Sequence, residues 1–178
     1  FAYVERKVEL EDGTMGTTLQ KHVMRYQQMF ASYAIKKTLK KNIKSGIIWH
    51  TQGSGKTALA YYNIKILTDF FAQRNIVAKF YFIVDRIDLM EQSTDEFAAR
   101  GLVVRNAKSR DELMKDITSR SITHNNEGKL EIMVVNIQKF KEDKTTVKVE
   151  DSYNTQLQRI FFIDEAHLIF NEASKTLL

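Results

Sequence analysis

The 178-residue sequence contains no cysteine and no proline. Without cysteine the chain can form neither disulfide bonds nor thiolate metal sites, and the lack of proline suits a chain rich in helices and strands. No apolar run approaches the roughly 20 residues that a membrane-spanning helix needs. No N-terminal segment joins a basic start to an apolar core, as a secretory signal would. We therefore expect a cytoplasmic protein that has no membrane partner.

Acidic residues are missing from one long part of the chain. Between Gly13 and Thr68 there is no aspartate or glutamate, although nine lysine and arginine residues lie in this stretch. This excess of positive charge favours the binding of a polyanion, either a nucleotide or a nucleic-acid backbone. Five of the nine cations fall at helical spacing, and a solvated helix face is the simpler interpretation of these five. They are Lys36, Lys37, Lys40, Lys41 and Lys44.

The length and the hydrophobic content of 43% predict a globular chain with one main domain. Residues 1–18 contain turn signals, and we expect them to be a lead-in from a preceding domain with one short strand. Because the sequence starts without methionine and stops soon after its last motif, we expect residues 19–178 to be a domain truncated at its C-terminal end.

Three continuous apolar runs of strand length indicate strands buried on both faces. These runs are residues 80–84, 132–135 and 160–163, and a further short buried strand is predicted at 47–49. Periodic segments predict helices within 18–42 and at 58–71, 89–99 and 111–119, while 121–129 and 141–156 read as exposed loops. Strands that alternate with helices predict an α/β fold with a parallel β-sheet flanked by helices.

A glycine-rich segment, Gly53-Ser54-Gly55-Lys56-Thr57, follows the predicted strand at 47–49. Glycine lets the backbone turn tightly so that its N–H groups can surround a phosphate. The lysine then reaches the terminal phosphates of ATP, and the threonine hydroxyl can bind Mg²⁺. The alternative interpretation is a glycine-rich turn without a ligand.

A second signal, Asp164-Glu165-Ala166-His167, follows the last apolar run. A carboxylate at a strand end can hold the same Mg²⁺ as Thr57, and an adjacent glutamate can orient the attacking water. Asp164 and Glu165 are therefore the candidate magnesium ligand and catalytic residue. His50 stands where the usual phosphate-loop pattern has its first glycine.

Five ordered segments resemble the motifs of superfamily 2 helicases, and together they are similar to the motor subunit of type I restriction enzymes. The segments are 25–31 (RYQQMFA), 47–57 (IIWHTQGSGKT), 85–92 (DRIDLMEQ), 135–140 (VNIQKF) and 164–167 (DEAH). The resemblance runs from about Arg25 to His167. Leu168 stands where related chains tend to have a basic residue.

This resemblance implies a RecA-like P-loop lobe, the first of two, in an ATP-driven translocase that pulls duplex DNA within a restricting enzyme. Arg25 and Gln28 would contact the adenine, and Gly53, Ser54, Gly55, Lys56 and Thr57 would hold the phosphates. His167 would couple the nucleotide state to DNA-side residues; taken alone it reads as a helix-start histidine satisfied by a neighbour. Arg86, Gln138 and Lys139 would face nucleic acid.

The same resemblance implies partners whose sequences are not among these 178 residues. These partners are a second motor lobe with an arginine finger, a nuclease domain of the same subunit, and the specificity and methyltransferase subunits. Two other interpretations stay open: a DEAH-box helicase or remodeller lobe, and a nucleotide-dependent binding module without turnover. The DRIDLMEQ segment at 85–92 argues against the first of these.

Overall fold

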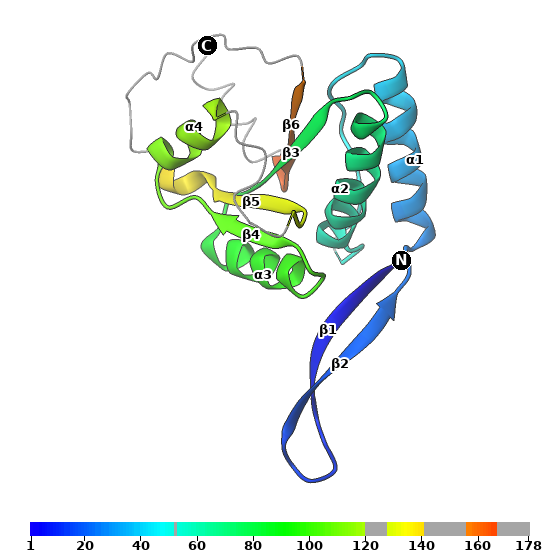
Figure 1. Ribbon diagram of the computed structural model, residues 1–178, viewed down its shortest axis with the longest axis vertical. Coiled ribbons are helices and arrows are strands. Elements are labelled where there is room, and N and C mark those ends of the chain that lie inside the picture. The colour runs from blue at the N-terminus through cyan, green and yellow to red at the C-terminus, as the bar shows by residue number, and fades with distance from the viewer. Residues whose placement is uncertain (52, 120–127, 141–155, 167–178) are drawn as a thin grey trace.

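The computed structural model describes residues 1–51, 53–119, 128–140 and 156–166 (Figure 1). The elements in chain order are β1 (Ala2–Glu9), β2 (Met15–His22), α1 (Tyr26–Lys40), α2 (Lys56–Ala72), β3 (Val77–Val84), α3 (Ile87–Ala98), β4 (Val103–Asn106), α4 (Arg110–Thr118), β5 (Glu131–Asn136), the 3₁₀ turn η1 (Ile137–Phe140) and β6 (Leu157–Ile163). The last four strands form one parallel sheet in the order β4-β5-β3-β6. The predicted α/β fold, a RecA-like domain with a parallel sheet flanked by helices, is confirmed.

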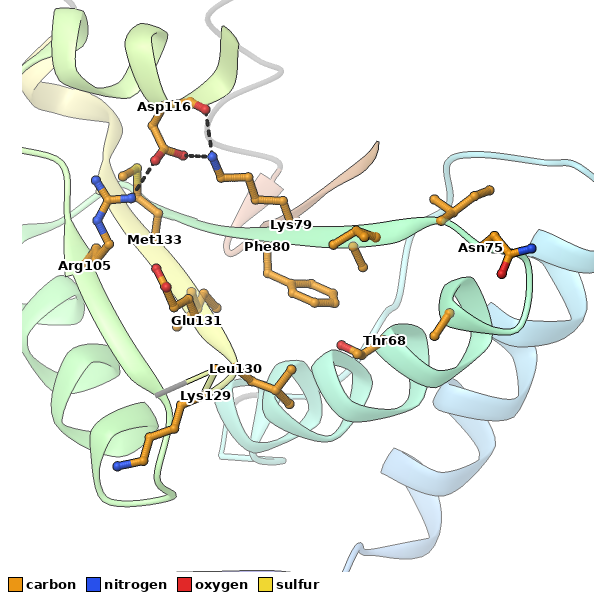
Figure 2. A pocket seen from close by; sticks show the side chains of 16 residues that line it. Thr68, Asn75, Lys79, Phe80, Arg105, Asp116, Lys129, Leu130, Glu131 and Met133 are labelled. Carbon is orange, nitrogen blue, oxygen red and sulfur yellow. Dashed lines mark hydrogen bonds and ion pairs between the residues drawn. The ribbon is translucent and has the colours of Figure 1, made fainter. Parts of the chain in front are cut away.

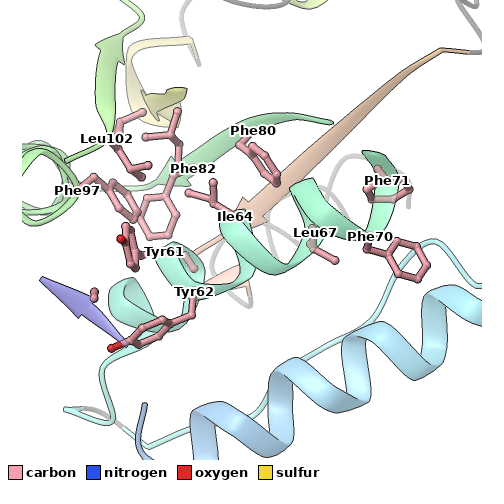
Figure 3. Close-up of a cluster of buried hydrophobic side chains, with 14 of the residues drawn as sticks. Tyr61, Tyr62, Ile64, Leu67, Phe70, Phe71, Phe80, Phe82, Phe97 and Leu102 are labelled. Atoms are coloured by element: carbon pink, nitrogen blue, oxygen red, sulfur yellow. The ribbon is translucent and has the colours of Figure 1, made fainter. Parts of the chain in front are cut away.

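The two faces of the sheet are covered by different helices because successive side chains of a strand point to opposite sides. Phe80, Phe82 and Val84 of β3 pack with the apolar side chains of α2 and α3 (Figure 3). Tyr81 lies on the other face, in a smaller cluster to which α4 contributes Leu113 and Ile117. Alternate residues of one continuous apolar run are therefore buried against two layers.

The three predicted apolar runs all lie inside strands, and three of the predicted helices correspond to α2, α3 and α4. The expectation that each of these strands is buried on both faces is wrong for β6, where Phe161 is 45% exposed and Ile163 38% exposed. β6 has one paired neighbour, β3, among the described strands, so its outer edge and part of one face are uncovered. The prediction of loops at 121–129 and 141–156 falls almost entirely outside the described residues.

The expectation of a buried strand at 47–49 is also wrong. These residues adopt no regular structure, and Ile47 and Trp49 are 85% and 92% exposed. A strand needs a neighbour for its backbone hydrogen bonds, and none of the described strands pairs with this segment. The segment therefore reaches the glycine loop as an exposed connection without regular structure.

The N-terminal residues form an antiparallel hairpin, β1–β2, rather than a lead-in with one short strand. Gly13 (φ 78°) allows the turn, and the Asp12 carboxylate accepts hydrogen bonds from the Thr14 backbone and hydroxyl. The base of the hairpin is anchored, because Val4 is fully buried and Glu5 N donates to Ala99 O at 2.8 Å.

Because β2 extends to His22, the first helix begins at Tyr26 and not at the predicted residue 18. Its second strand, β2, crosses the predicted domain boundary after residue 18, and that division of the chain stays a prediction. Across the described residues, no helix combines the length and the apolar character that crossing a membrane would require.

Candidate nucleotide-binding site

The glycine loop leads directly into α2, whose N-terminal cap is Gly55. Gly53 and Gly55 have φ values of 75° and 78°, in the left-handed region that side chains disfavour. A Cβ at Gly55 would lie 2.7 Å from Gln28 Nε2, so the Gln28 amide would have to move to admit a side chain there. The first backbone N–H groups of a helix have no acceptor within the helix, so this loop presents donors and a positive dipole end to an anion.

Gln28 ties the glycine loop to the start of α1. Its side chain is buried, and Nε2 donates to the carbonyl oxygens of Ser54 at 3.3 Å and Gly55 at 3.0 Å. Its Oε1 accepts a hydrogen bond from Arg25 N at 2.9 Å, which caps the helix. The Gln28 amide therefore holds the loop, and the Arg25 backbone is joined to the loop through Gln28. Their contact with adenine stays a prediction.

Lys56, the first residue of α2, reaches across to the end of β6. Its Nζ lies 3.0 Å from Glu165 Oε1, and about one third of each side chain is exposed. Thr57 and Asp164 are the sequence neighbours of this pair. The contact therefore joins the glycine loop to the acidic motif, which lie more than 100 residues apart in the chain.

Asp164 and Glu165 are held at the sheet edge by their backbone. Asp164 N donates to Ile83 O of β3 at 2.9 Å, and Glu165 N donates to Asp164 Oδ1 at 3.1 Å. Glu165 has φ 47°, an uncommon value for a residue with a side chain. Burial raises the pKa of Asp164, the charge of Lys56 opposes this, and the nearby carboxylates of Glu165 and Asp85 raise it further. A bound cation would relieve this accumulation of negative charge.

The residues present fit a nucleotide with Mg²⁺. Ser54 Oγ and His50 Nδ1 are buried in and beside the loop, and neither has a hydrogen-bond partner among the described residues. An orphaned buried polar atom is costly unless a ligand or water satisfies it. The two left-handed glycines and Lys56 lie beside these atoms in the sequence, and the binding of phosphate oxygens by this loop stays a prediction.

The predicted nucleic-acid residues lie along the same edge of the sheet. β3 and β5 pair so that Val84 stands beside Asn136, and Arg86 and Gln138 each follow two residues later. Arg86 is exposed, and its guanidinium makes two hydrogen bonds to the Asp88 carboxylate, at 3.1 and 2.7 Å. Gln138 is exposed at the start of η1, to which Lys139 also belongs, and Asn136 Oδ1 accepts a hydrogen bond from Gln138 N. His167 lies outside the described residues.

A second polar cluster, which the sequence reasoning missed, lies on the face of the sheet that α4 covers (Figure 2). The buried Asp116 of α4 accepts from Tyr81 OH at 2.8 Å and pairs with Lys79 at 3.0 Å and Arg105 at 2.5 Å. Burial by itself would raise the pKa of Asp116, but hydrogen bonds from Lys79, Arg105 and Tyr81 together lower it. Burial raises the pKa of Tyr81, and the charge of Asp116 adds to the rise.

This cluster borders a cavity of about 520 Å³ between the beginnings of β3 and β5 and the end of α2. The cavity is remote from the glycine loop, which precedes the other end of α2. Lys79 Nζ also donates to the backbone carbonyl of Asp116. A cation that neutralises carbonyl groups at a helix C-terminus is favourable, so we interpret the cluster as the anchor of α4 on the sheet.

Comparison with known proteins places the sequence of this chain in a family. The family model described as SWI2/SNF2 ATPase matches residues 27–175. A type I restriction enzyme endonuclease subunit of Staphylococcus aureus (strain COL) is 31% identical over 147 residues, covering 81% of this chain and 14% of that protein. A putative type I restriction enzyme endonuclease subunit of Methanocaldococcus jannaschii is 36% identical over 87 residues, 46% of this chain and 8% of that protein.

A third relative, the C-terminal part of a putative type I restriction enzyme endonuclease subunit of Mycoplasma pneumoniae, is 29% identical over 74% of this chain and 60% of its own length. No solved structure matches the chain significantly. The Staphylococcus aureus relative is a far longer protein, of which this chain spans about one seventh. The family model covers most of the chain, from the helix that bears Gln28 through the loop to the acidic motif. The chain belongs to the SWI2/SNF2 ATPase family.

Proposed function

We propose that this chain is the first motor lobe of a type I restriction enzyme subunit, in which ATP hydrolysis drives translocation along duplex DNA before cleavage. The observation that carries the proposal is the contact of Lys56 with Glu165 at 3.0 Å, because it joins the two motifs that an ATPase needs. The restriction subunits with which the chain aligns support the choice of system.

Each residue has a role that follows from its position. Backbone N–H groups around Gly53 and Gly55 and the ammonium of Lys56 bind the phosphates, while Gln28 keeps the loop in its binding conformation. Thr57 and Asp164 would hold Mg²⁺, which would neutralise charge on the phosphates when bound. Glu165 orients the attacking water. The proposed nucleotide site and the proposed DNA-side residues are neighbours, since Arg86 follows β3, Gln138 follows β5 and Asp164 follows β6 at the carboxyl ends of these parallel strands.

The other domains and subunits of the proposed enzyme would be formed by residues outside this sequence. A second motor lobe would complete the site with an arginine finger, a group that raises the rate by roughly 10³ to 10⁵ in GTPases. A nuclease domain of the same subunit and the specificity and methyltransferase subunits would be its partners, in the cytoplasm. His167 would connect the nucleotide state to the DNA-side residues Arg86, Gln138 and Lys139.

The proposal is tested by the displacement of a third strand from a DNA triplex by the intact subunit and its partners. A duplex translocase displaces the third strand in the presence of ATP and leaves the underlying duplex intact. Separation of the two duplex strands would instead favour a helicase, and an absence of both activities together with tight ATP binding would favour a binding module. An Asp164→Asn subunit serves as the control that cannot use ATP.

A further inference from the structure

The outward face of α1 carries a regular row of exposed side chains. Tyr26, Phe30, Tyr33, Lys37 and Lys40 follow one another at alternating steps of four and three residues, and all five are exposed. Residues spaced in this way lie in one line along a helix, with an average repeat of 3.5 residues. We call these five residues the α1 row.

The aromatic half of the row is uncovered to an unusual degree. Tyr26, Phe30 and Tyr33 are 66%, 63% and 68% exposed, whereas the buried side chains of α1 are the polar Gln28 and Ser32. An amphipathic helix normally turns its largest apolar side chains inward. α1 does the reverse: its polar inner side meets the glycine loop through Gln28, and Ile35 and Leu39 pack only partly on the core. Clustered exposed aromatics of this kind mark a surface that another chain segment covers.

The period and the charge of the row indicate what covers it. A seam with a 3.5-residue repeat suits another α-helix lying along α1, because side chains of the second helix then fit between successive members of the row. The last turn of α1 contains Lys37 and Lys40, and the helix has no acidic residue. A helix that lies on the row therefore needs apolar side chains opposite the aromatic half and carboxylates opposite the lysines.

We propose that the α1 row is the docking surface for an acidic amphipathic helix of the same subunit. The longer relatives provide ample chain for such a helix, since the aligned 147 residues are 14% of the Staphylococcus aureus protein. Duplex DNA fits the row less well. Its phosphates would pair with Lys37 and Lys40, but its backbone would leave the rings of Tyr26, Phe30 and Tyr33 uncovered.

The inference does not rest on ATP turnover or translocation, and its test measures neither. In the intact subunit, without DNA, Tyr33 is replaced by the photoreactive residue p-benzoylphenylalanine, and cross-linked peptides are identified by mass spectrometry. Lys108, an exposed residue that precedes α4, receives the same replacement as the control position. The expected result is a cross-link from position 33 to one segment of the same polypeptide, with apolar residues at three- and four-residue steps and neighbouring Asp or Glu. Position 108 should not cross-link to that segment.

Charge reversal then tests the lysine half of the row. Lys37→Glu combined with Lys40→Glu should abolish most of the cross-link from position 33, while Lys108→Glu should leave it unchanged. The proposal is overturned if position 33 gives no cross-link in the subunit, if it reacts with added random-sequence duplex DNA instead, or if the captured segment lacks acidic residues. An undiminished cross-link after charge reversal would overturn it as well.

Discussion

Lys56 Nζ and Glu165 Oε1 lie 3.0 Å apart, so the lysine that should bind phosphate is held by the glutamate that should orient water. In the proposed function, the phosphates would compete with Glu165 for the ammonium group of Lys56. Loss of the ion pair would then free the Glu165 carboxylate to orient the water, so the pair would link nucleotide binding to the release of the proposed catalytic group.

Replacement of Glu165 with glutamine should affect binding and hydrolysis in opposite directions. Because the carboxylate no longer competes for Lys56, ATP affinity should rise by up to about fivefold, as the loss of a partly exposed ion pair allows. Hydrolysis should fall by about 10²- to 10⁴-fold, the contribution of a positioned general base. Equilibrium binding and turnover in the DNA-stimulated subunit measure the two effects. Glu96→Gln, which removes a carboxylate paired with Arg100 and Arg6, is the control, and weaker ATP binding by Glu165→Gln would contradict the role given to the pair.

The two glycines of the loop should differ in their tolerance of alanine. Both have left-handed φ values, which cost an ordinary residue about 1 to 2 kcal/mol. At Gly53 nothing lies within 4 Å of an added Cβ, whereas at Gly55 the Cβ would collide with Gln28 Nε2. Gly55→Ala should therefore lose more stability and more ATP affinity than Gly53→Ala, as measured by urea unfolding and nucleotide titration. Equal losses would show that the Gln28 contact does not constrain the loop.

Replacement of Gln28 with alanine distinguishes a loop-holding role from adenine recognition. Both ends of the Gln28 amide are bound within the protein, so its loss should loosen the loop and weaken ATP and GTP binding by a similar factor, about tenfold. Affinities for the two nucleotides are compared in the same subunit, with the neighbouring Gln27→Ala as the control. A loss confined to ATP would mean that Gln28 reads the base.

Asp116 should make the stability of the domain depend on pH. Its pKa is lowered in the folded state, so its contribution is complete above the pKa of the unfolded chain, near 3.8, and is lost as pH falls through the lower folded value. Asp116→Asn leaves Lys79 as a buried charge without its carboxylate and should cost about 3 kcal/mol at pH 7.

The cost of Asp116→Asn should begin to shrink as pH falls below about 3.8, where the carboxyl becomes neutral in the unfolded chain, and should disappear below the lower folded pKa, where it is neutral in the folded protein as well. Urea unfolding at the two pH values measures the difference. The exposed Asp69→Asn on α2 controls for the loss of a carboxylate in general. A cost that is unchanged by acid would contradict the network.

The sequence predicted well the elements whose signal is local. Continuous apolar runs placed β3, β5 and β6, and the glycine loop placed α2, because a strand buried between two layers and a phosphate loop each impose a pattern on consecutive residues. β4 was missed, since Val103–Asn106 is only four residues long and gives no such pattern. The segment at 47–49 shows that a short apolar run is not enough to predict a strand, because a strand also needs a pairing partner and this segment pairs with none of the described strands.

Contacts between residues that are distant in the sequence could not be predicted from local sequence patterns. The Asp116 network joins three elements, and no local pattern marks an aspartate in α4 as the partner of a lysine in β3 and an arginine in β4. The three- and four-residue steps of Tyr26, Phe30 and Tyr33 correctly predicted a helix. They did not indicate which side of that helix faces the core, because the polar Gln28 is required at the loop and takes the inner position.

The assignment of the ATP site depends above all on Lys56, and DNA-stimulated ATP hydrolysis by the intact subunit carrying Lys56→Ala tests it. Lys65→Ala, on the exposed side of the same helix, is the matched control. Because Lys56 supplies the point charge for the terminal phosphates, its loss should abolish turnover while the control retains the wild-type rate. Unchanged hydrolysis by the Lys56→Ala subunit would contradict the assignment of this loop as the ATP site.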